Sequence, residues 1–358
     1  MPIVTVILPV YNSEPFLETA VKSIQAQTLT DWELLIISEY GSGDHTTSIA
    51  RRLQASDERI VLIENPRRLG LSESLNIGIR RAAGKYIARM DADDLAHPTR
   101  FEKQVRFLEQ HPGVAVCGTW QHHFGPDTDW IHKGAVTVEQ CCANLLFFCD
   151  LCHSTLMLRT EVFQTRGLFY DGQYLAEDFE LWTRVLLYGD IVNLPEILGE
   201  YRCGDTNITL AKKERLHEES GVIVSNSLKR NLKLCLTEEE MKCMRNWHNP
   251  AEDARDRDVF FHQLETALRK IDQANRRELF YQQQALLNAI FAKWRWIKYY
   301  EPFTSIKSVT SIDAVFQYTP RHPFFERLHC FLKNNRGIRS KLRKLRQKFA
   351  AYYSKYIR

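Results

Sequence analysis

The sequence predicts an α/β fold in which an open, doubly wound sheet occupies residues 1–208 and a helical region follows at 209–332. Two observations carry this prediction. Up to about residue 90, strand-like apolar runs alternate with helix-like periodicities, and the links between them are short. Residues 210–300 are rich in Lys, Glu, Gln, Leu and Arg at helical spacing. Strands separated by helices of this length pair in parallel through right-handed crossovers, which gives the doubly wound arrangement.

The elements of the N-terminal third follow in order. A buried strand is predicted at residues 3–11, and Ser13 is predicted to cap a helix that carries Pro15 in its first turn and apolar residues up to Ile24. Further strands are predicted at 32–38, 59–64 and 86–90, with helices at 46–53 and 71–83 and a stop at Gly84.

Three carboxylates, Asp91, Asp93 and Asp94, follow the fourth strand within four positions. Ligands bind at the carboxyl ends of the strands in such sheets, and this rule puts Tyr11, Glu39 and Asp91 along one rim. Carboxylates this close repel one another unless the turn is solvated or a cation lies among them. Two interpretations stay open: an acidic turn with a helix cap, or a site for Mg²⁺ or Mn²⁺ together with substrate phosphates.

A second acidic pair, Glu177 and Asp178, opens a predicted amphipathic helix at 176–189. The helix macrodipole favours acidic residues at that end and accounts for the pair by itself. The functional interpretation makes one of the two a general base.

Several function classes are disfavoured by the sequence. The GSGD turn at 41–44 lacks the phosphate-loop and dinucleotide-binding patterns, so a nicotinamide enzyme is not favoured, and Asp44 is expected to cap the next helix. The nine cysteines are odd in number and scattered, and Cys149-x-x-Cys152 has no second pair to complete a zinc set. No leader pattern and no run of 18 apolar residues is found, so we expect a cytoplasmic protein with reduced thiols.

The last 26 residues, Lys333–Arg358, carry ten Lys or Arg and no Asp or Glu, against a net charge of +4 for the whole chain. Their apolar residues share one helical face and are Ile338, Leu342, Leu345, Phe349, Tyr352 and Tyr356. We expect this basic helix to lie on an anionic membrane surface. The alternatives are that this helix binds nucleic acid or that it packs against the body of the protein. We favour the membrane surface and therefore expect no nucleic-acid partner.

Taken together, several stretches resemble family-2 glycosyltransferases of the GT-A fold over about residues 3–205. The stretches are VILPVYNSEPFLETAVKSIQAQT, LGLSESLNIGIRRAAGKYIARMDADDLAHPTRFEKQ, CHSTLMLRTEVF and AEDFELWTRV, with a strand that ends at Ser38–Glu39. The resemblance implies a GT-A domain, which is a Rossmann-like mixed sheet, and it implies a bacterial polysaccharide-type enzyme that inverts the anomeric carbon. It gives no information beyond about residue 210.

The resemblance also implies roles for individual residues. On the donor side, Pro9, Tyr11 and Asn12 would line the nucleoside pocket. Glu39 would stand where the family usually has an aspartate that accepts a hydrogen bond from the uracil ring. Arg68 would reach the base or the phosphates. The triplet Asp91–Ala92–Asp93 matches the DxD motif of the family, with Asp93 the direct ligand of Mn²⁺ or Mg²⁺ and Asp91 nearer the ribose.

On the acceptor side, Asp178 matches the proposed base, with Glu177 beside it. The chain departs from the family at two places. Glu39 replaces the usual aspartate, and Cys203 stands after Tyr201–Arg202 where relatives often have a histidine near the metal. The nearest alternative imidazole in the sequence is His153.

The resemblance implies transfer of a sugar from a nucleotide diphosphate sugar, a UDP-sugar first of all, to a hydroxyl of a glycan or a lipid-linked acceptor in surface polysaccharide biosynthesis. Such an enzyme would work in the cytoplasm, on the inner face of the cell membrane. The alternatives are a polyprenyl-phosphate sugar synthase, a nucleotidyltransferase that would release pyrophosphate, and a scaffold without catalysis.

Overall fold

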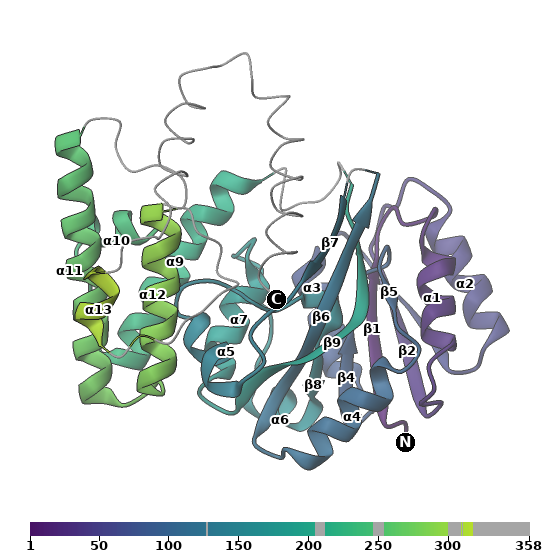
Figure 1. The fold of residues 1–358 in the computed structure, drawn as a ribbon. Coiled ribbons are helices and arrows are strands. Elements are labelled where there is room, and N and C mark those ends of the chain that lie inside the picture. The colour runs from purple at the N-terminus through teal and green to yellow at the C-terminus, as the bar shows by residue number, and fades with distance from the viewer. Residues whose placement is uncertain (127, 205–211, 246–253, 300–308, 310, 318–358) are drawn as a thin grey trace.

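The fold comes from a computed structural model that describes residues 1–126, 128–204, 212–245, 254–299, 309 and 311–317. A twisted sheet stands at the centre with helices on both faces, and a group of helices from the C-terminal part packs at one side (Figure 1). The basic segment 333–358 lies outside the described residues.

The described residues form a mixed sheet in the order β3-β2-β1-β4-β8-β6-β9-β5, with β7 paired to β6. The strands are β1 (Val4–Val10), β2 (Trp32–Ser38), β3 (Ile60–Glu64), β4 (Tyr86–Arg89), β5 (Leu95–Ala96), β6 (Val114–Gly125), β7 (Thr128–His132), β8 (Met157–Arg159) and β9 (Asp190–Arg202). The first four strands are parallel to one another, as predicted. Strand β8 runs antiparallel between β4 and β6.

Helices cover both faces because the buried strands are apolar on both sides. In β2, Leu34 and Ile36 join one core while Leu35 and Ile37 join the other, which is the alternation of a fully buried strand. The helices of this part are α1 (Leu17–Gln25), α2 (Thr46–Ser56), α3 (Leu71–Arg81), α4 (Arg100–Gln110), α5 (Val138–Asn144), the 3₁₀ turn η1 (His153–Thr155), α6 (Thr160–Arg166) and α7 (Glu177–Val185). These elements confirm the predicted α/β class.

Two local predictions are wrong. Ser13 does not cap α1, which begins four residues later at Leu17; its hydroxyl instead donates to the carbonyl of Tyr11 at 3.1 Å. Gly84 does not stop α3, because this helix already ends at Arg81 with Ala82 as its C-cap. It is required for another reason: a Cβ at this position would lie 2.6 Å from the backbone nitrogen of Thr5, so only glycine lets the chain pass β1 this closely.

The C-terminal part is helical where it is described, as the sequence predicts. Its helices are α9 (Lys213–Leu232), α10 (Glu238–Arg245), α11 (Ala254–Glu278), α12 (Gln283–Tyr299) and α13 (Ile312–Gln317). Their apolar faces share one core with α3, α6 and α7, and the Arg230 guanidinium donates to the carbonyl of Thr183 in α7 at 2.7 Å. Within the described ranges, every helix is too short or too polar to span a bilayer.

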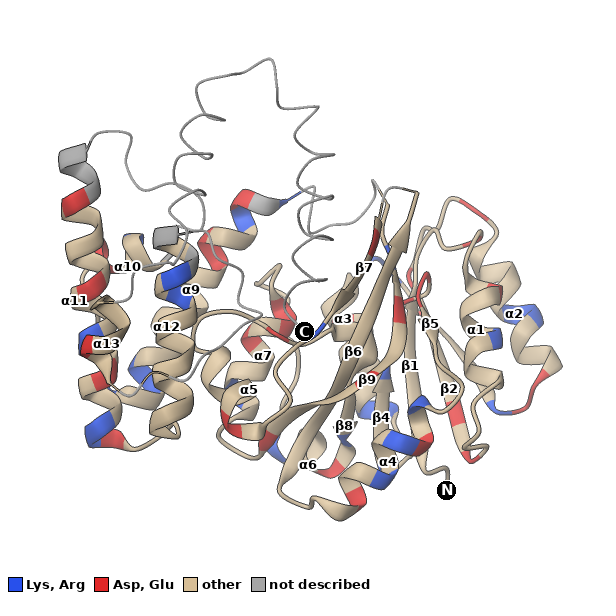
Figure 2. Cartoon of the chain, in the orientation of Figure 1, with Lys and Arg blue, Asp and Glu red and all other residues tan. Residues whose placement is uncertain are grey.

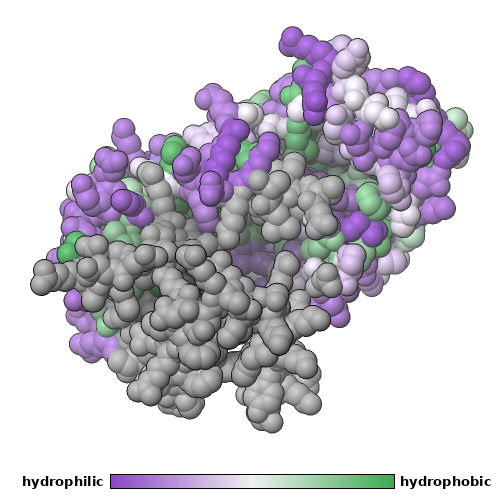
Figure 3. Space-filling model, turned by 90° about the horizontal axis from the view of Figure 1, so that it is seen from above, coloured by the Kyte–Doolittle hydropathy of each residue, from purple (hydrophilic) through white to green (hydrophobic). Residues whose placement is uncertain are grey.

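Charged side chains are spread over the helices, and the strands carry few of them (Figure 2). Seen from above, onto the end of the sheet where β6 meets β7, the described surface is mainly hydrophilic with small scattered hydrophobic areas (Figure 3).

Candidate active site

The strand register brings the predicted rim residues to one edge of the sheet. Val10 pairs with Ser38 across β1 and β2, and Ile7 pairs with Arg89 across β1 and β4. The N–H of Glu39 donates to the carbonyl of Val10 at 3.0 Å. The segments that begin at Tyr11, Glu39 and Asp91 therefore leave the sheet side by side, because carboxyl ends of parallel strands share an edge.

Tyr11 and Arg68 form an open face on this rim. The Arg68 guanidinium lies over the Tyr11 ring, 4.9 Å from its centroid, and the ring is 38% exposed. Asn12 has a left-handed φ of 49° and accepts the N–H of Gly43 on its side-chain oxygen at 2.8 Å. Pro9 lies in β1 and pairs with Ile37 of β2. A flat ring with a cation above it suits a base or a phosphate as ligand.

Glu39 holds the loop that carries Arg68. Its carboxylate accepts the N–H groups of Leu69 (3.0 Å), Gly70 and Tyr40 (2.8 Å). Burial by itself would raise the pKa of Glu39, but these hydrogen bonds outweigh it and the pKa lies below its usual value. Because both oxygens already bond the backbone, the most direct role of Glu39 is to fix the 65–70 loop against the rim.

Asp91 and Asp93 have different surroundings. Asp91 forms an ion pair with Arg89, whose side chain is only 4% exposed. Asp93 makes no ion pair within the described part of the chain, and burial together with the charge of Asp91 raises its pKa. Ala92 is buried between the two.

These residues fit a hard divalent ion. Mg²⁺ and Mn²⁺ favour carboxylate oxygens and are commonly held by one or two of them together with substrate phosphates. Among the described residues, no group of three His, Cys, Asp or Glu side chains could hold a metal ion. An ion at Asp93 would also offset the repulsion between the two carboxylates.

Asp94 and Arg202 tie the acidic turn to β9. The Arg202 N–H donates to Asp94 Oδ1 at 3.0 Å, and its guanidinium Nε donates to the carbonyl of Asp93 at 3.1 Å. Burial and the charge of Asp91 raise the pKa of Asp94 to about 8. The contact joins residues 108 positions apart, so it cannot be read from the sequence.

Two buried side chains of α4, Arg100 and Gln104, donate hydrogen bonds to backbone carbonyls next to the rim. Arg100 donates to the carbonyls of Arg89 (2.9 Å) and Leu156 (3.1 Å), and Gln104 donates to the carbonyl of Thr155 at 2.8 Å. Neither residue is among those predicted from the sequence. Their spacing of four residues, which puts two polar side chains on the buried face of a helix, is the signal that could have found them.

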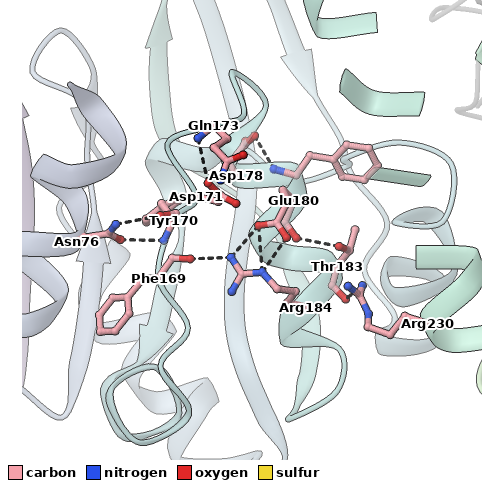
Figure 4. A network of polar contacts seen from close by, with 11 residues as sticks. Asn76, Phe169, Tyr170, Asp171, Gln173, Asp178, Glu180, Thr183, Arg184 and Arg230 are labelled. Atoms are coloured by element: carbon pink, nitrogen blue, oxygen red, sulfur yellow. Dashed lines mark hydrogen bonds and ion pairs between the residues drawn. The ribbon is translucent and has the colours of Figure 1, made fainter. Parts of the chain in front are cut away.

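Glu177 and Asp178 are the first two residues of α7. Figure 4 shows Asp178 among the polar contacts of this region. The Phe179 N–H donates to Asp178 Oδ1 at 2.6 Å. Burial raises the pKa of Asp178, while this hydrogen bond and the charge of Arg89 act against the rise. Burial and the charge of Asp178 raise the pKa of Glu177 to about 8. Both carboxyls also interact electrostatically with Asp91, so the structure brings the second acidic pair to the rim.

His153 packs beneath the same region. Its Nε2 lies 2.8 Å from the Tyr170 hydroxyl, and its ring meets the Trp182 ring edge-on at 6.0 Å. Burial and the charge of Arg89 hold the pKa of His153 well below its usual value, so the ring is neutral. The Cys203 sulfur lies 3.9 Å from His123 Nδ1.

The sequence falls within a known family. Its residues 5–167 match the family described as Glycosyl transferase family 2. It is 33% identical over 216 residues to an uncharacterized glycosyltransferase of Haemophilus influenzae, and the match covers 56% of this chain and 65% of that protein. It is 32% identical to the putative glycosyltransferase EpsE of Bacillus subtilis, over 66% of this chain and 85% of that protein. The amylovoran biosynthesis glycosyltransferase AmsE of Erwinia amylovora is 28% identical, over 56% of this chain and 76% of that protein.

A solved structure agrees with the fold. The crystal structure of S. aureus TarS 1–349 in complex with UDP-GlcNAc superposes with a TM-score of 0.52 at 14% identity, over 83% of this chain and 88% of that chain. The likeness supports the GT-A fold that the sequence predicts. The chain belongs to glycosyl transferase family 2.

Proposed function

We propose that this chain is an inverting glycosyltransferase that moves a sugar from a UDP-sugar to a hydroxyl of a glycan or lipid-linked acceptor in surface polysaccharide biosynthesis. One observation carries the proposal: Glu177 and Asp178 at the start of α7 interact electrostatically with Asp91 and with its ion-pair partner Arg89, although more than 80 residues separate the two segments. Two carboxylate groups at one rim are what such a transfer needs, one toward the leaving group and one toward the attacking hydroxyl.

The environments of Glu177 and Asp178 support a division of roles. Neighbouring carboxyls whose pKa values are pushed apart take different protonation states. Glu177, with a pKa of about 8, keeps its proton at neutral pH. Burial raises the pKa of Asp178 as well, but the Phe179 N–H that it accepts and the charge of Arg89 oppose this rise and favour its ionised form. Asp178 is therefore the group that takes the proton from the acceptor hydroxyl, and attack from that side inverts the anomeric carbon.

On the donor side, Tyr11 and Arg68 would bind the nucleoside and its phosphates, with Pro9 and Asn12 beside them and Glu39 holding the loop. Asp93, assisted by Asp91, would hold Mn²⁺ or Mg²⁺, which when bound stabilises charge on the leaving diphosphate as a Lewis acid. The UDP-GlcNAc bound to TarS supports a UDP-sugar, and the relative in amylovoran biosynthesis supports a polysaccharide acceptor. Docking to the inner face of the membrane through residues 333–358 belongs to the same proposal.

The test measures which nucleotide product is released. The full chain is incubated with UDP-sugars and GDP-mannose, with Mn²⁺ and an acceptor extract, and nucleoside diphosphate and pyrophosphate are quantified together. We expect UDP release. Pyrophosphate release would identify a nucleotidyltransferase, and no release from any donor would favour a scaffold. A product sugar linked to polyprenyl phosphate, in place of a glycan hydroxyl, would favour the polyprenyl-phosphate sugar synthase.

A further inference from the structure

A group of rings beyond the acidic rim is not used by the proposed mechanism. It consists of His123 on β6, Trp130 on β7 and Tyr201 on β9, which are direct cross-strand neighbours. The His123 and Trp130 rings stack with centroids 4.1 Å apart and planes 29° apart, and the His123 and Tyr201 rings lie 4.9 Å apart. We call these three residues the ring platform.

The outer ring of the platform is open to solvent. Trp130 is 49% exposed although tryptophan is normally among the more buried side chains. His123 covers part of it from behind and fixes the ring, so a ligand would meet a surface that is already ordered. The hairpin of β6 and β7 stands at the end of the sheet where β1 and β9 also end (Figure 1).

Strand alternation indicates which face of the sheet carries the platform. Gln121, two residues before His123, donates to the Ser154 hydroxyl of η1 at 2.7 Å. A Cβ on Gly199, which pairs with Gln121, would point at Thr155, also in η1. Residues two apart on a strand point to the same face. His123 and Tyr201 therefore lie on the face that carries η1, whose His153 contacts the Trp182 ring of α7.

The platform is also close to the acidic turn along the chain. Tyr201 directly precedes Arg202, which bonds both Asp93 and Asp94. The Arg202 guanidinium itself lies on the other face of β9, over the ring of Phe124, 4.7 Å from its centroid. The platform thus adjoins the candidate active site without sharing its charged groups.

The chemistry of the platform suits a neutral ligand. Burial and the neighbouring histidines lower the pKa of His123 to about 4, so the ring carries no charge at neutral pH. A flat, uncharged aromatic surface favours a partner with an apolar face and polar edges. A pyranose ring has that form, since its C–H groups lie on one face and its hydroxyls around the edge. An anionic ligand would gain nothing from this stack.

We propose that Trp130, backed by His123 and Tyr201, binds a sugar ring of the glycan acceptor and so positions its hydroxyl near α7. This inference rests on the proposed transfer to a glycan. It makes the β6–β7 hairpin the part of the protein that recognises the acceptor.

The test uses the full chain and two variants of the same hairpin. Trp130→Ala removes the exposed ring, whereas Ile131→Ala removes a side chain of similar exposure, 41%, from the opposite face of β7 and is the matched control. Wild type and both variants are applied to an array of bacterial-polysaccharide oligosaccharides. UDP release to water is measured without acceptor on the same preparations, after their folding has been checked by circular dichroism.

We expect wild type and Ile131→Ala to bind a common set of oligosaccharides, and Trp130→Ala to bind them at least about tenfold more weakly, as for an aromatic anchor. UDP release to water should be equal in all three proteins. Equal oligosaccharide binding by Trp130→Ala, or no binding by the wild type, would overturn the inference. If none of the three proteins releases UDP even when the acceptor extract is present, the proposed function is refuted instead, so the two failures are distinguishable.

Discussion

The two sides of the candidate site are assembled in different ways. On the donor side, groups follow directly at the ends of neighbouring parallel strands, and the backbone holds them: Glu39 bonds the N–H groups of Leu69 and Gly70. On the acceptor side, side chains join distant segments, as Asn76 does when it accepts the N–H of Tyr170, 94 positions along the chain. The donor side is thus fixed by the sheet itself, while the acceptor side depends on side chains that can vary without altering the sheet.

Asp178→Asn gives the largest expected effect and separates the two sides. The amide cannot take a proton, so kcat should fall about 10²- to 10⁴-fold while donor binding is unchanged. Transfer is followed by UDP release with acceptor present, and donor binding by calorimetry. Asp171→Asn changes a carboxylate that accepts the Gln173 N–H at 3.0 Å (Figure 4), and as the control it should keep full activity. Near-wild-type transfer by Asp178→Asn would refute the assignment of the base.

Asp93→Ala is the reciprocal change on the donor side. It removes the carboxylate that is free of ion pairs in the described structure, so the dependence of UDP-sugar binding on Mn²⁺ should be lost. Calorimetric titrations with and without Mn²⁺ measure this, and Asp178→Asn, which should retain the dependence, is the comparison. If Mn²⁺ strengthens donor binding equally in both variants, Asp93 has no part in the metal site.

Glu39→Gln should affect the donor side more moderately. One of the two oxygens that accept backbone N–H groups becomes a donor, which costs about 1–3 kcal/mol and loosens the loop that carries Arg68. The KM for the UDP-sugar should rise about tenfold with kcat nearly constant. Glu39→Asp keeps the charge and should have a smaller effect. A fall in kcat at constant KM would show that Glu39 acts in the chemical step.

Arg89→Met has the smallest expected effect, because it moves a pH profile without removing a reacting group. Arg89 lowers the pKa of Asp178, so its loss should raise that pKa and shift the acidic limb of kcat/KM to higher pH. Activity should fall at neutral pH and recover at alkaline pH. Arg80→Met, which removes an exposed arginine paired with Glu73, is the control. An unchanged limb, with the variant folded, would mean that Arg89 does not influence the base.

The sequence predicted the shared rim at the strand ends because the information for it is local. Strand ends, acidic turns and helix periodicities are each contained in a few residues, and together they placed Tyr11, Glu39 and Asp91 on one rim. The ion pair of Arg89 with Asp91 was not predicted from the sequence, because a single arginine in a strand is usually interpreted as an edge or surface residue. The role of His153 with Tyr170 depends on a tertiary contact, which no local pattern records.

The central claim is that the acidic turn after β4 and the start of α7 face one substrate. A crystal structure with UDP and Mn²⁺, in which the metal is located by its anomalous scattering, tests it most directly. We expect an anomalous peak at the Asp93 carboxylate, in contact with the diphosphate, and Asp178 turned toward the place where the donor sugar would lie. A peak bound by other residues, or a diphosphate shielded from Asp178 by protein, would contradict the account.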